Sequence, residues 1–346
     1  MKYISLFSGI GGFEVAIHAA FPKAKCLGYS EIKLSAKKIY ENHFPDHINL
    51  EDISKISPDT VEDIVKDGCD LVVAGFPCTN LSSMATLKGN HSGLNGPKSG
   101  LFYQLLNFLR IVFQKCPEVN IIIENNASMS GQNKDLITTS LQTLTNRAIY
   151  LSKIDNADLS VQTRKRLFWT TFPVEKPTKC LHEWKDILEP LEIIDKRFYV
   201  SDAYMNGMNT IIKQKKSPYL LFMRKSGEYQ EFFVIENPEK NGRTRYQLSM
   251  HSDTGDKTPY TYPIGKSRPI CAGGGGGFSN GMLVDRRAGK DHQFLFRYFT
   301  MKEKERLFGF PDDYTKLLSS NTCRSDVLGN AVSVYCVSHI LKYINI

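Results

Sequence analysis

A single thiol stands out in the stretch "GFPCTNLSS" (75–83), where Cys78 follows a proline and the apolar run Leu71–Ala74. A thiolate there could act as a nucleophile, although neither His nor Lys lies beside it in sequence to activate it. A buried cysteine that closes a strand would give the same local sequence, because free Cys is among the most buried residue types. The stretch by itself leaves a catalytic and a structural interpretation open.

A carboxylate, Glu124, ends a second apolar run in "IIIENN" (121–126). If the two runs form neighbouring strands, their ends lie only about 5 Å apart. Cys78 and Glu124 would then face the same crevice, as a nucleophile beside a proton donor. An ion-paired structural glutamate remains the alternative.

Two guanidinium groups lie close together in "QTRKRLFW" (162–169), at Arg164 and Arg166. In a strand, residues at i and i+2 point to the same side. Paired guanidiniums indicate a nearby phosphate, carboxylate or charged partner. An exposed edge strand would carry the same pattern without any function.

A glycine turn, "LFSGIGGFE" (6–14), follows the first apolar run and could bring the backbone close to a ligand. A dinucleotide fingerprint would require glycine at position 14, but the residue is Glu14, whose carboxylate would oppose a pyrophosphate. Glu31 lies twenty residues after Gly11, where an acid that binds a ribose is expected. Adenosine without phosphates fits this pattern better than NAD or FAD, which points to S-adenosylmethionine.

Alternating strands and helices in the first half of the chain would position these residues. Helical stretches such as 14–21 and 101–115 lie between apolar runs typical of buried parallel strands, at 3–7, 26–30, 71–75, 120–124, 148–154 and 166–172, with the direction of the last left open. This alternation predicts a doubly wound α/β sheet. Ligands of such sheets bind outside the carboxyl ends of the strands, where the polar residues described above are expected.

The pattern changes between residues 175 and 267. From Met205 to Arg268 there are eleven Lys and Arg against six Asp and Glu, with aromatic residues interleaved. Basic and aromatic residues together suit a nucleic-acid surface, although a small β-rich domain with a solvated face would look the same. Beyond the glycine run in "CAGGGGGF" (271–278), Thr300 and Glu303 form a predicted capping box at the start of a helix. The last predicted helices return to the sequence pattern of the first half of the chain.

The composition sets outer limits on the class of protein. The chain has 346 residues and a net charge of 44 − 36 = +8, which suits a polyanion partner but does not require one. No apolar run approaches the roughly 18 residues that span a bilayer, so no membrane association is expected. The eight cysteines form no C-x-x-C pair, so neither zinc nor another metal is expected, and scattered thiols suit a reducing cytoplasm.

Taken together, the motifs resemble those of the DNA (cytosine-5)-methyltransferase family. They occur in the family's order as "FSGIGG", "GFPC", "ENN", "QTRKR", "RLFGFPDDY" and "GNAV", spanning residues 3 to about 340. The resemblance implies a Rossmann-like catalytic and S-adenosylmethionine-binding domain over 1–174. It further implies a smaller, β-rich target-recognition domain over 175–267, and a return segment over 268–346 with a glycine-rich hinge and the helices that complete the catalytic domain.

The family's roles can be carried over residue by residue. Cys78 would be the nucleophile, Glu124 would contact N3 and the amine of cytosine, and Arg164 and Arg166 would sit beside the target ring and the carboxylate. The cofactor site implied by the resemblance consists of Phe7, Gly9, Gly11, Glu31 on the ribose, Asp52 near the adenine, Leu101 and Asn330. The implied DNA contacts are Ser82 and Lys88 in a closing lid over 79–100, with Arg224, Lys225, Arg243 and Arg245 as candidate base readers.

The implied reaction is transfer of a methyl group to C5 of a flipped-out cytosine in a short sequence of double-stranded DNA, through a bond between Cys78 and C6. A monomer acting on DNA in the cytoplasm, or in the nucleoid of a bacterium, is expected. Two departures occur: Asn126 replaces the usual Val or Pro, and Arg268–Ala272 lacks the usual threonines. The alternatives are the tRNA-methylating branch of the family, a nucleic-acid-binding protein without catalysis, and a Rossmann oxidoreductase. The recognised sequence, and a role in restriction–modification or epigenetic marking, are left open.

Overall fold

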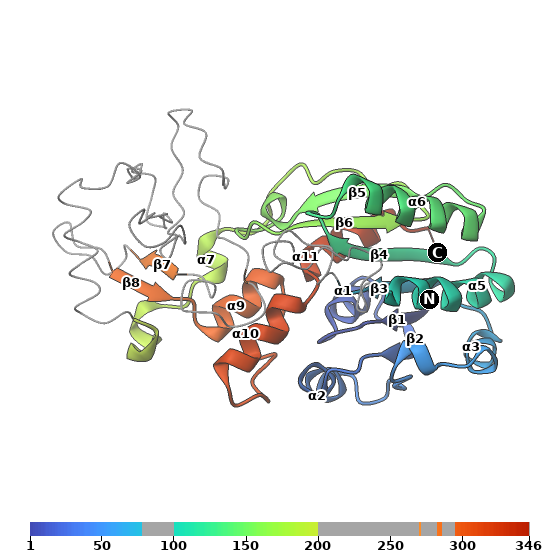
Figure 1. The fold of residues 1–346 in the computed structure, drawn as a ribbon. Helices are drawn as coiled ribbons and strands as arrows, with labels where there is room; N and C mark the ends of the chain where they lie inside the picture. The colour runs from blue at the N-terminus through green and yellow to red at the C-terminus, as the bar shows by residue number, and fades with distance from the viewer. Residues whose placement is uncertain (78–99, 200–269, 271–281, 286–294, 346) are drawn as a thin grey trace, which may run out of the picture. The chain divides into compact units, whose positions relative to one another are not determined.

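The computed structural model describes residues 1–77, 100–199, 270, 282–285 and 295–345 (Figure 1). Cys78, Ser82, Lys88, Arg224, Lys225, Arg243 and Arg245 lie outside the described residues. The chain divides into two compact units. Unit 1 comprises Met1–Asp155, Lys165–Thr178 and Ala331–Ile346, and unit 2 comprises Asn156–Arg164 and Lys179–Asn330.

Unit 1 is built on a six-stranded sheet of order β2-β1-β3-β4-β6-β5. Its strands are β1 (Lys2–Leu6), β2 (Lys25–Ser30), β3 (Leu71–Gly75), β4 (Asn120–Asn126), β5 (Tyr150–Asp155) and β6 (Lys165–Thr170). The predicted α/β sheet is confirmed, with parallel pairing across β2, β1, β3 and β4.

The sheet is mixed rather than wholly parallel, because β6 runs antiparallel to both β4 and β5. The direction of this strand was the one that the sequence left open. Only residues 156–164 connect β5 to β6. A parallel pair needs a crossover of a dozen or more residues, so a connection this short favours an antiparallel return.

Helices cover the sheet of unit 1, and the predicted helix over 101–115 is found at those bounds. They are α1 (Gly12–Ala20), α2 (Leu34–His43), α3 (Pro58–Val65), α5 (Leu101–Lys115), α6 (Gly131–Thr145) and α11 (Val334–Ile340), with short turns η1 (Ile53–Lys55) and η6 (Leu341–Tyr343). One continuous apolar core joins the strands to α3, α5 and α6, and includes Ile4, Val61, Val72, Leu105, Leu109, Ile121, Ile137 and Trp169. From the far end of the chain, α11 packs against α1. The helix α11 therefore belongs to unit 1, and the predicted return segment over 268–346 stays a prediction.

The described part of unit 2 contains η3 (Asn156–Asp158), α7 (Trp184–Ile187), η4 (Leu191–Ile193), η5 (Lys196–Phe198), β7 (Met282–Asp285), β8 (Leu295–Tyr298), α9 (Met301–Phe308) and α10 (Asn321–Asn330). The predicted capping box at α9 is confirmed, since Thr300 and Glu303 bond each other's backbone N–H groups. Glu303 also forms a fully buried two-bond ion pair with Arg297, at 2.7 and 2.8 Å.

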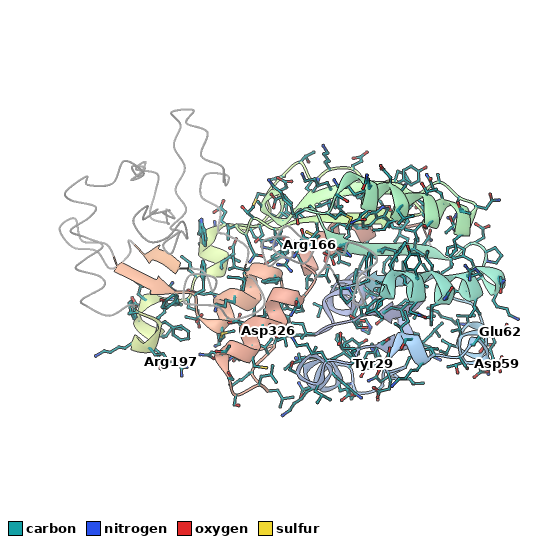
Figure 2. All side chains as sticks on the ribbon, viewed as in Figure 1. Tyr29, Asp59, Glu62, Arg166, Arg197 and Asp326 are labelled. Atoms are coloured by element: carbon teal, nitrogen blue, oxygen red, sulfur yellow. The ribbon has the colours of Figure 1, made fainter. Side chains whose placement is uncertain are left out.

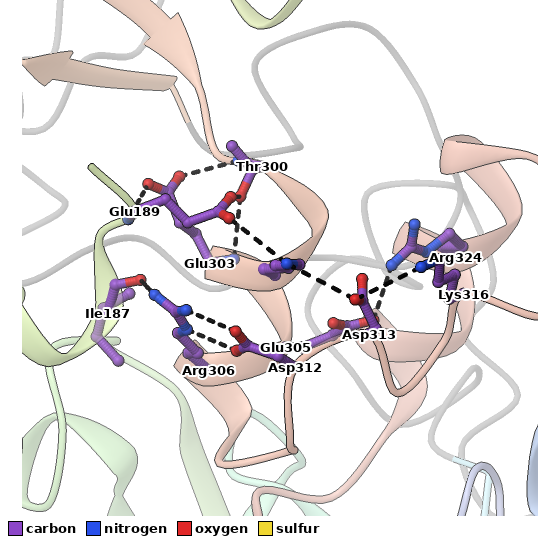
Figure 3. A network of polar contacts seen from close by, with 11 residues as sticks. Ile187, Glu189, Thr300, Glu303, Glu305, Arg306, Asp312, Asp313, Lys316 and Arg324 are labelled. Carbon is purple, nitrogen blue, oxygen red and sulfur yellow. Dashed lines mark hydrogen bonds and ion pairs between the residues drawn. The ribbon is translucent and has the colours of Figure 1, made fainter. Parts of the chain in front are cut away.

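Further charged groups surround α9 (Figure 3). Arg306 binds both carboxylate oxygens of Asp312 at 2.6 Å, and Arg324 binds the buried Glu305 at 3.0 Å. Removing one partner of a buried pair such as Arg297–Glu303 typically lowers the free energy of unfolding by about 3–5 kcal/mol, because the other charge is left uncompensated. Among the described helices of both units, none is long and apolar enough to span a bilayer.

Candidate active site

The carboxyl ends of β3 and β4 are adjacent, as the sequence predicts. The two strands pair in parallel, with Gly75 opposite Glu124. The chain is described as far as Pro77, two residues beyond the end of β3. Cys78 is the next residue in the sequence and lies outside the described residues.

Glu124 is held by an ion pair with Arg166 from the antiparallel strand β6. Arg166 Nε lies 2.8 Å from Glu124 Oε1, and the two side chains are 15% and 13% exposed. Figure 2 labels Arg166 on the ribbon of this sheet. A charge-assisted hydrogen bond of this kind fixes the direction of the carboxylate while leaving it partly accessible. The ion pair therefore holds Glu124 in one orientation at the end of β4.

Gly75 allows the second oxygen of Glu124 to lie close to the backbone of β3. A Cβ atom built at Gly75 would lie 3.4 Å from Glu124 Oε2 and 3.8 Å from the ring of Phe13. A Cβ atom at position 75 would therefore make ordinary van der Waals contact with both groups.

Arg164 and Arg166 have different partners in the described part of the chain. Arg164 precedes the first residue of β6, so strand alternation does not govern its direction. Its nearly buried guanidinium donates to the carbonyls of Ile270 at 3.2 Å and Gly329 at 2.9 Å. It also lies 4.8 Å from the ring centroid of Phe308. Within unit 2, Arg164 thus joins backbone segments that are far apart in sequence.

Asn125 makes contacts at this strand end that were not predicted from the sequence. Its buried side chain donates from Nδ2 to the carbonyl of Phe76 at 3.1 Å and accepts from the N–H of Asn126 at 2.7 Å. The amide thus ties the end of β4 to the chain two residues before Cys78. No local sequence pattern marks this contact, because the Phe76 carbonyl belongs to a different part of the chain. Asn126, the departure noted above, instead accepts from the backbone and hydroxyl of Ser128.

The glycine turn between β1 and α1 adopts left-handed backbone conformations. Phe7, Gly9 and Gly11 have φ angles of 54°, 58° and 90°. The left-handed conformation costs free energy at Phe7, because a residue with a Cβ atom rarely adopts a positive φ angle. Gly11 is the N-cap of α1, and its helix start has no side-chain cap.

Glu31 lies beside this turn, as predicted. Its Oε2 accepts from the N–H of Gly9 at 2.8 Å, and its Oε1 accepts from the N–H of Lys33 at 2.7 Å. Because a carboxylate offers about four lone-pair sites, these two bonds orient Glu31 and still leave acceptors for hydroxyl groups. Gly9 N–H is already occupied by a carboxylate, which disfavours a pyrophosphate and fits an unphosphorylated nucleoside.

Further residues of the predicted cofactor site can be placed individually. Asp52 caps η1, and its hydrogen bonds from the hydroxyl and N–H of Ser54 lower the pKa of its carboxyl group. Leu101 begins α5 and packs against the core. Asn330 ends α10 in unit 2 and donates to the carbonyl of Asp326 at 2.9 Å. The sequence reasoning missed Ile32, which is 62% exposed directly after Glu31 and offers an apolar surface for the face of a base.

Comparisons with known proteins agree on one family. The profile described as "C-5 cytosine-specific DNA methylase" matches residues 1–345. Type II methyltransferase M.NlaIV of Neisseria lactamica is 31% identical over 438 aligned positions, covering 96% of each chain. Type II methyltransferase M.Sau3AI of Staphylococcus aureus is 24% identical, covering 98% of this chain and 94% of the relative. The solved structure of the Entamoeba histolytica methyltransferase EhMeth is similar in fold, with a TM-score of 0.63 at 16% identity over 99% and 97% of the chains.

Proposed function

Because the chain belongs to the C-5 cytosine-specific DNA methylase family, we propose that it methylates C5 of a flipped-out cytosine in a short sequence of duplex DNA. The family membership inferred from the order of the motifs is confirmed, and the chain is a DNA (cytosine-5)-methyltransferase family enzyme. The observation that carries the proposal is the Glu124–Arg166 pair at the end of β4, beside the end of β3.

The carbon to be methylated is a poor nucleophile, and the proposed roles follow from that difficulty. The Cys78 thiolate adds to C6, which makes C5 enamine-like, while Glu124 holds a proton at N3. Arg166 keeps the Glu124 carboxyl group directed toward the ring. After methylation, a base removes the C5 proton and the thiol is expelled, which restores the aromatic ring. Asn125 acts as a positioning residue, because its bond to Phe76 fixes the chain that leads to Cys78.

S-adenosylmethionine fits the glycine turn of unit 1, and when bound it supplies the methyl group as a sulfonium. Glu31 is oriented to accept from ribose hydroxyls, and the turn at Phe7, Gly9 and Gly11 leaves the backbone of the helix start accessible. Ile32 offers the adenine an apolar contact, and Asp52 offers an acceptor for its amine. Leu101 is proposed to complete the pocket of unit 1.

The DNA-reading parts of the proposal concern residues outside the described ranges. Ser82 and Lys88 would contact the DNA backbone from a lid over 79–100. Arg224, Lys225, Arg243 and Arg245 would belong to a target-recognition domain over 175–267. Full-length similarity to proteins named type II methyltransferases supports a role in modifying one short sequence. In this proposal the enzyme acts on DNA as a monomer in the cytoplasm.

The test is covalent trapping on duplex DNA that contains 5-fluorocytosine. The fluorine at C5 cannot leave as a proton, so the reaction stalls with Cys78 bonded to C6. We expect a denaturant-stable complex from the wild type with cofactor and from Cys180→Ser, a control at an exposed cysteine. Cys78→Ser should fold but form no complex. A complex with tRNA in place of DNA would favour the tRNA branch, and a Cys78→Ser variant with full activity would contradict the mechanism.

A further inference from the structure

A fully buried carboxylate that this mechanism does not use lies behind the glycine turn. Glu14 belongs to the first turn of α1, three residues after Gly11, and its side chain has no solvent exposure. Its Oε1 accepts from the Tyr40 hydroxyl at 2.9 Å. Its Oε2 is buried with no hydrogen-bond partner in the part of the chain that the structure describes.

Polar groups from β1, β2, α1, α2 and the turn after α2 surround Glu14, and none of the groups named below is Lys or Arg. Ser5 and Tyr3 belong to β1, and Ser5 faces the carboxylate. The other groups are Cys26 of β2, His18 of α1, Tyr40 of α2 and His47 of the turn after α2. Tyr3 Oη lies 2.9 Å from His18 Nε2, and Tyr40 Oη lies 3.0 Å from His47 Nδ1.

No charged neighbour in this cluster neutralises Glu14 at pH 7. Burial lowers the pKa of His18, and burial lowers the pKa of His47 to about 4, so both rings are neutral there. Burial raises the pKa of Glu14 itself to about 7. A carboxylate in such surroundings exerts its charge through a medium that screens poorly, so it acts over a longer range than a surface group does.

We propose that Glu14 is a specificity-determining residue that lets the enzyme favour its cationic methyl donor over the neutral product of the transfer. The proposal rests on the function proposed above. S-adenosylmethionine and S-adenosylhomocysteine differ by one methyl cation, hence by one unit of charge. Ionised Glu14, within the first helical turn after the glycine turn, attracts only the former by charge. Coupling free energies between two sites typically correspond to fivefold or more in affinity, so a preference of at least about fivefold is expected.

The same charge couples donor binding to a proton. Binding of a cation stabilises ionised Glu14, so donor binding near pH 7 releases protons from the fraction of molecules in which Glu14 is protonated. Binding of the neutral product releases none from this residue. The preference for the donor therefore increases as pH rises through the titration of Glu14.

Isothermal titration calorimetry on the full chain tests this directly, without reliance on activity. S-adenosylmethionine and S-adenosylhomocysteine are titrated between pH 5.5 and 8.5, in buffers of different ionisation enthalpy. In the wild type, the ratio of the two Kd values should shift at least about fivefold toward the donor across this range. Proton release should accompany donor binding alone.

Glu14→Gln removes the charge while retaining the shape of the side chain. The amide oxygen can still accept from Tyr40, and the amide nitrogen can donate to Ser5 Oγ, which is itself buried without a partner in the described residues. This variant should fold, show a Kd ratio that does not vary with pH, and release no proton. Retention of the wild-type pH dependence by Glu14→Gln would overturn the proposal.

Tyr40→Phe provides a second test that a merely structural role would not pass. Loss of its hydroxyl removes a hydrogen bond that lowers the pKa of Glu14, so the midpoint of the Kd ratio should move to higher pH. Tyr29→Phe is the matched control, because Tyr29 stacks on Tyr40 at 3.9 Å but donates to Glu41. An unmoved midpoint in Tyr40→Phe would count against the proposal. A wild type that binds neither compound at any pH would instead overturn the proposed function.

Discussion

At the scale of single residues, the site depends on how Glu124 is held. Arg166 binds Oε1, and Gly75 leaves room beside Oε2. The arginine therefore fixes the direction of the carboxylate. A carboxyl group prepared in this way does not have to be reoriented when the target ring arrives, which is the condition for efficient proton transfer.

Replacing Glu124 with glutamine should lower kcat by about a hundredfold or more, because the amide cannot place a proton at N3. The measurement is single-turnover methyl transfer to duplex DNA, with Glu118→Gln as a control at an exposed glutamate in the turn before β4. Cofactor affinity should be unchanged. An activity within twofold of the wild type would exclude Glu124 from the chemistry.

Glu14 also gives the stability of the protein a characteristic dependence on pH. Its folded-state pKa of about 7 lies above the ordinary value of 4.5, so the folded protein binds this proton more tightly than the unfolded chain. The resulting stability is fully present below pH 4.5 and is lost as pH rises through 7. The free energy of unfolding falls by about 3 kcal/mol over this pH range.

Glu14→Gln should therefore resemble the wild type in stability at pH 5 and exceed it at pH 8. Urea unfolding at the two pH values measures the difference. Because His47 titrates in both proteins, its contribution cancels in the comparison. Equal gains at both pH values would show that the carboxylate does not titrate in this range.

The sequence identified several of these residues because a strand end or a glycine turn marks them. Glu124 ends an apolar run, and Glu31 follows one at a fixed spacing from Gly11. Asn125 and the Glu14 cluster could not be found in this way. Their importance comes from partners in other elements, Phe76 for the one and Tyr40 for the other, which only the packed structure brings together.

At the scale of elements, the adjacent ends of β3 and β4 form the frame of the site. The strands are joined by their ladder as far as Gly75 and Glu124, and the Asn125 amide extends this connection to Phe76. A side-chain amide thus replaces the backbone pairing where the strands end. The segment that carries Cys78 is anchored immediately before it leaves the sheet.

Asn125→Ala should reduce the rate of the 5-fluorocytosine adduct by about tenfold or more, because the Phe76 carbonyl loses its donor and the chain before Cys78 is no longer fixed. Cofactor affinity, measured by calorimetry, should change little. Asn126→Ala is the control, since its side-chain oxygen serves only the turn at Ser128 in the contacts described above. Equal adduct rates in both variants would contradict the positioning role.

The elements themselves were predictable where local patterns are strong. The helix at α5 and the capping box at α9 follow from apolar periodicity and from the Thr-x-x-Glu spacing. The direction of β6 was not predictable from its composition, because parallel and antiparallel buried strands share the same apolar residues. Arg164 shows a related limit, since its alternation with Arg166 ends where the strand begins at Lys165.

At the scale of the whole molecule, unit 1 is assembled from three stretches of chain. The last of them, Ala331–Ile346, places α11 against α1, the helix that begins at the glycine turn. His339 adds a 2.7 Å contact to the carbonyl of Glu175. The C-terminal segment therefore supports the helix that the proposed cofactor site depends on.

Ile340→Ala should destabilise the protein by about 2–5 kcal/mol, because the fully buried side chain of Ile340 leaves a cavity. Denaturant unfolding measures the loss, and cofactor affinity should fall in parallel under conditions where unit 1 is partly unfolded. Lys342→Ala, at an exposed position two residues further on, should have little effect on either quantity. Similar stability of the two variants would show that α11 contributes little to the stability of unit 1.

The three-stretch construction of unit 1 also bears on how such a protein can diverge. Residues 179–330 lie in sequence between the second and third stretches of unit 1, so for unit 1 they are equivalent to a long loop. The entropy of closing a loop grows only with the logarithm of its length, and each doubling costs only about 0.6 kcal/mol. Lineages can therefore lengthen, shorten or exchange this region at little thermodynamic cost to unit 1. The packing of α11 against α1 can stay the same while this region changes.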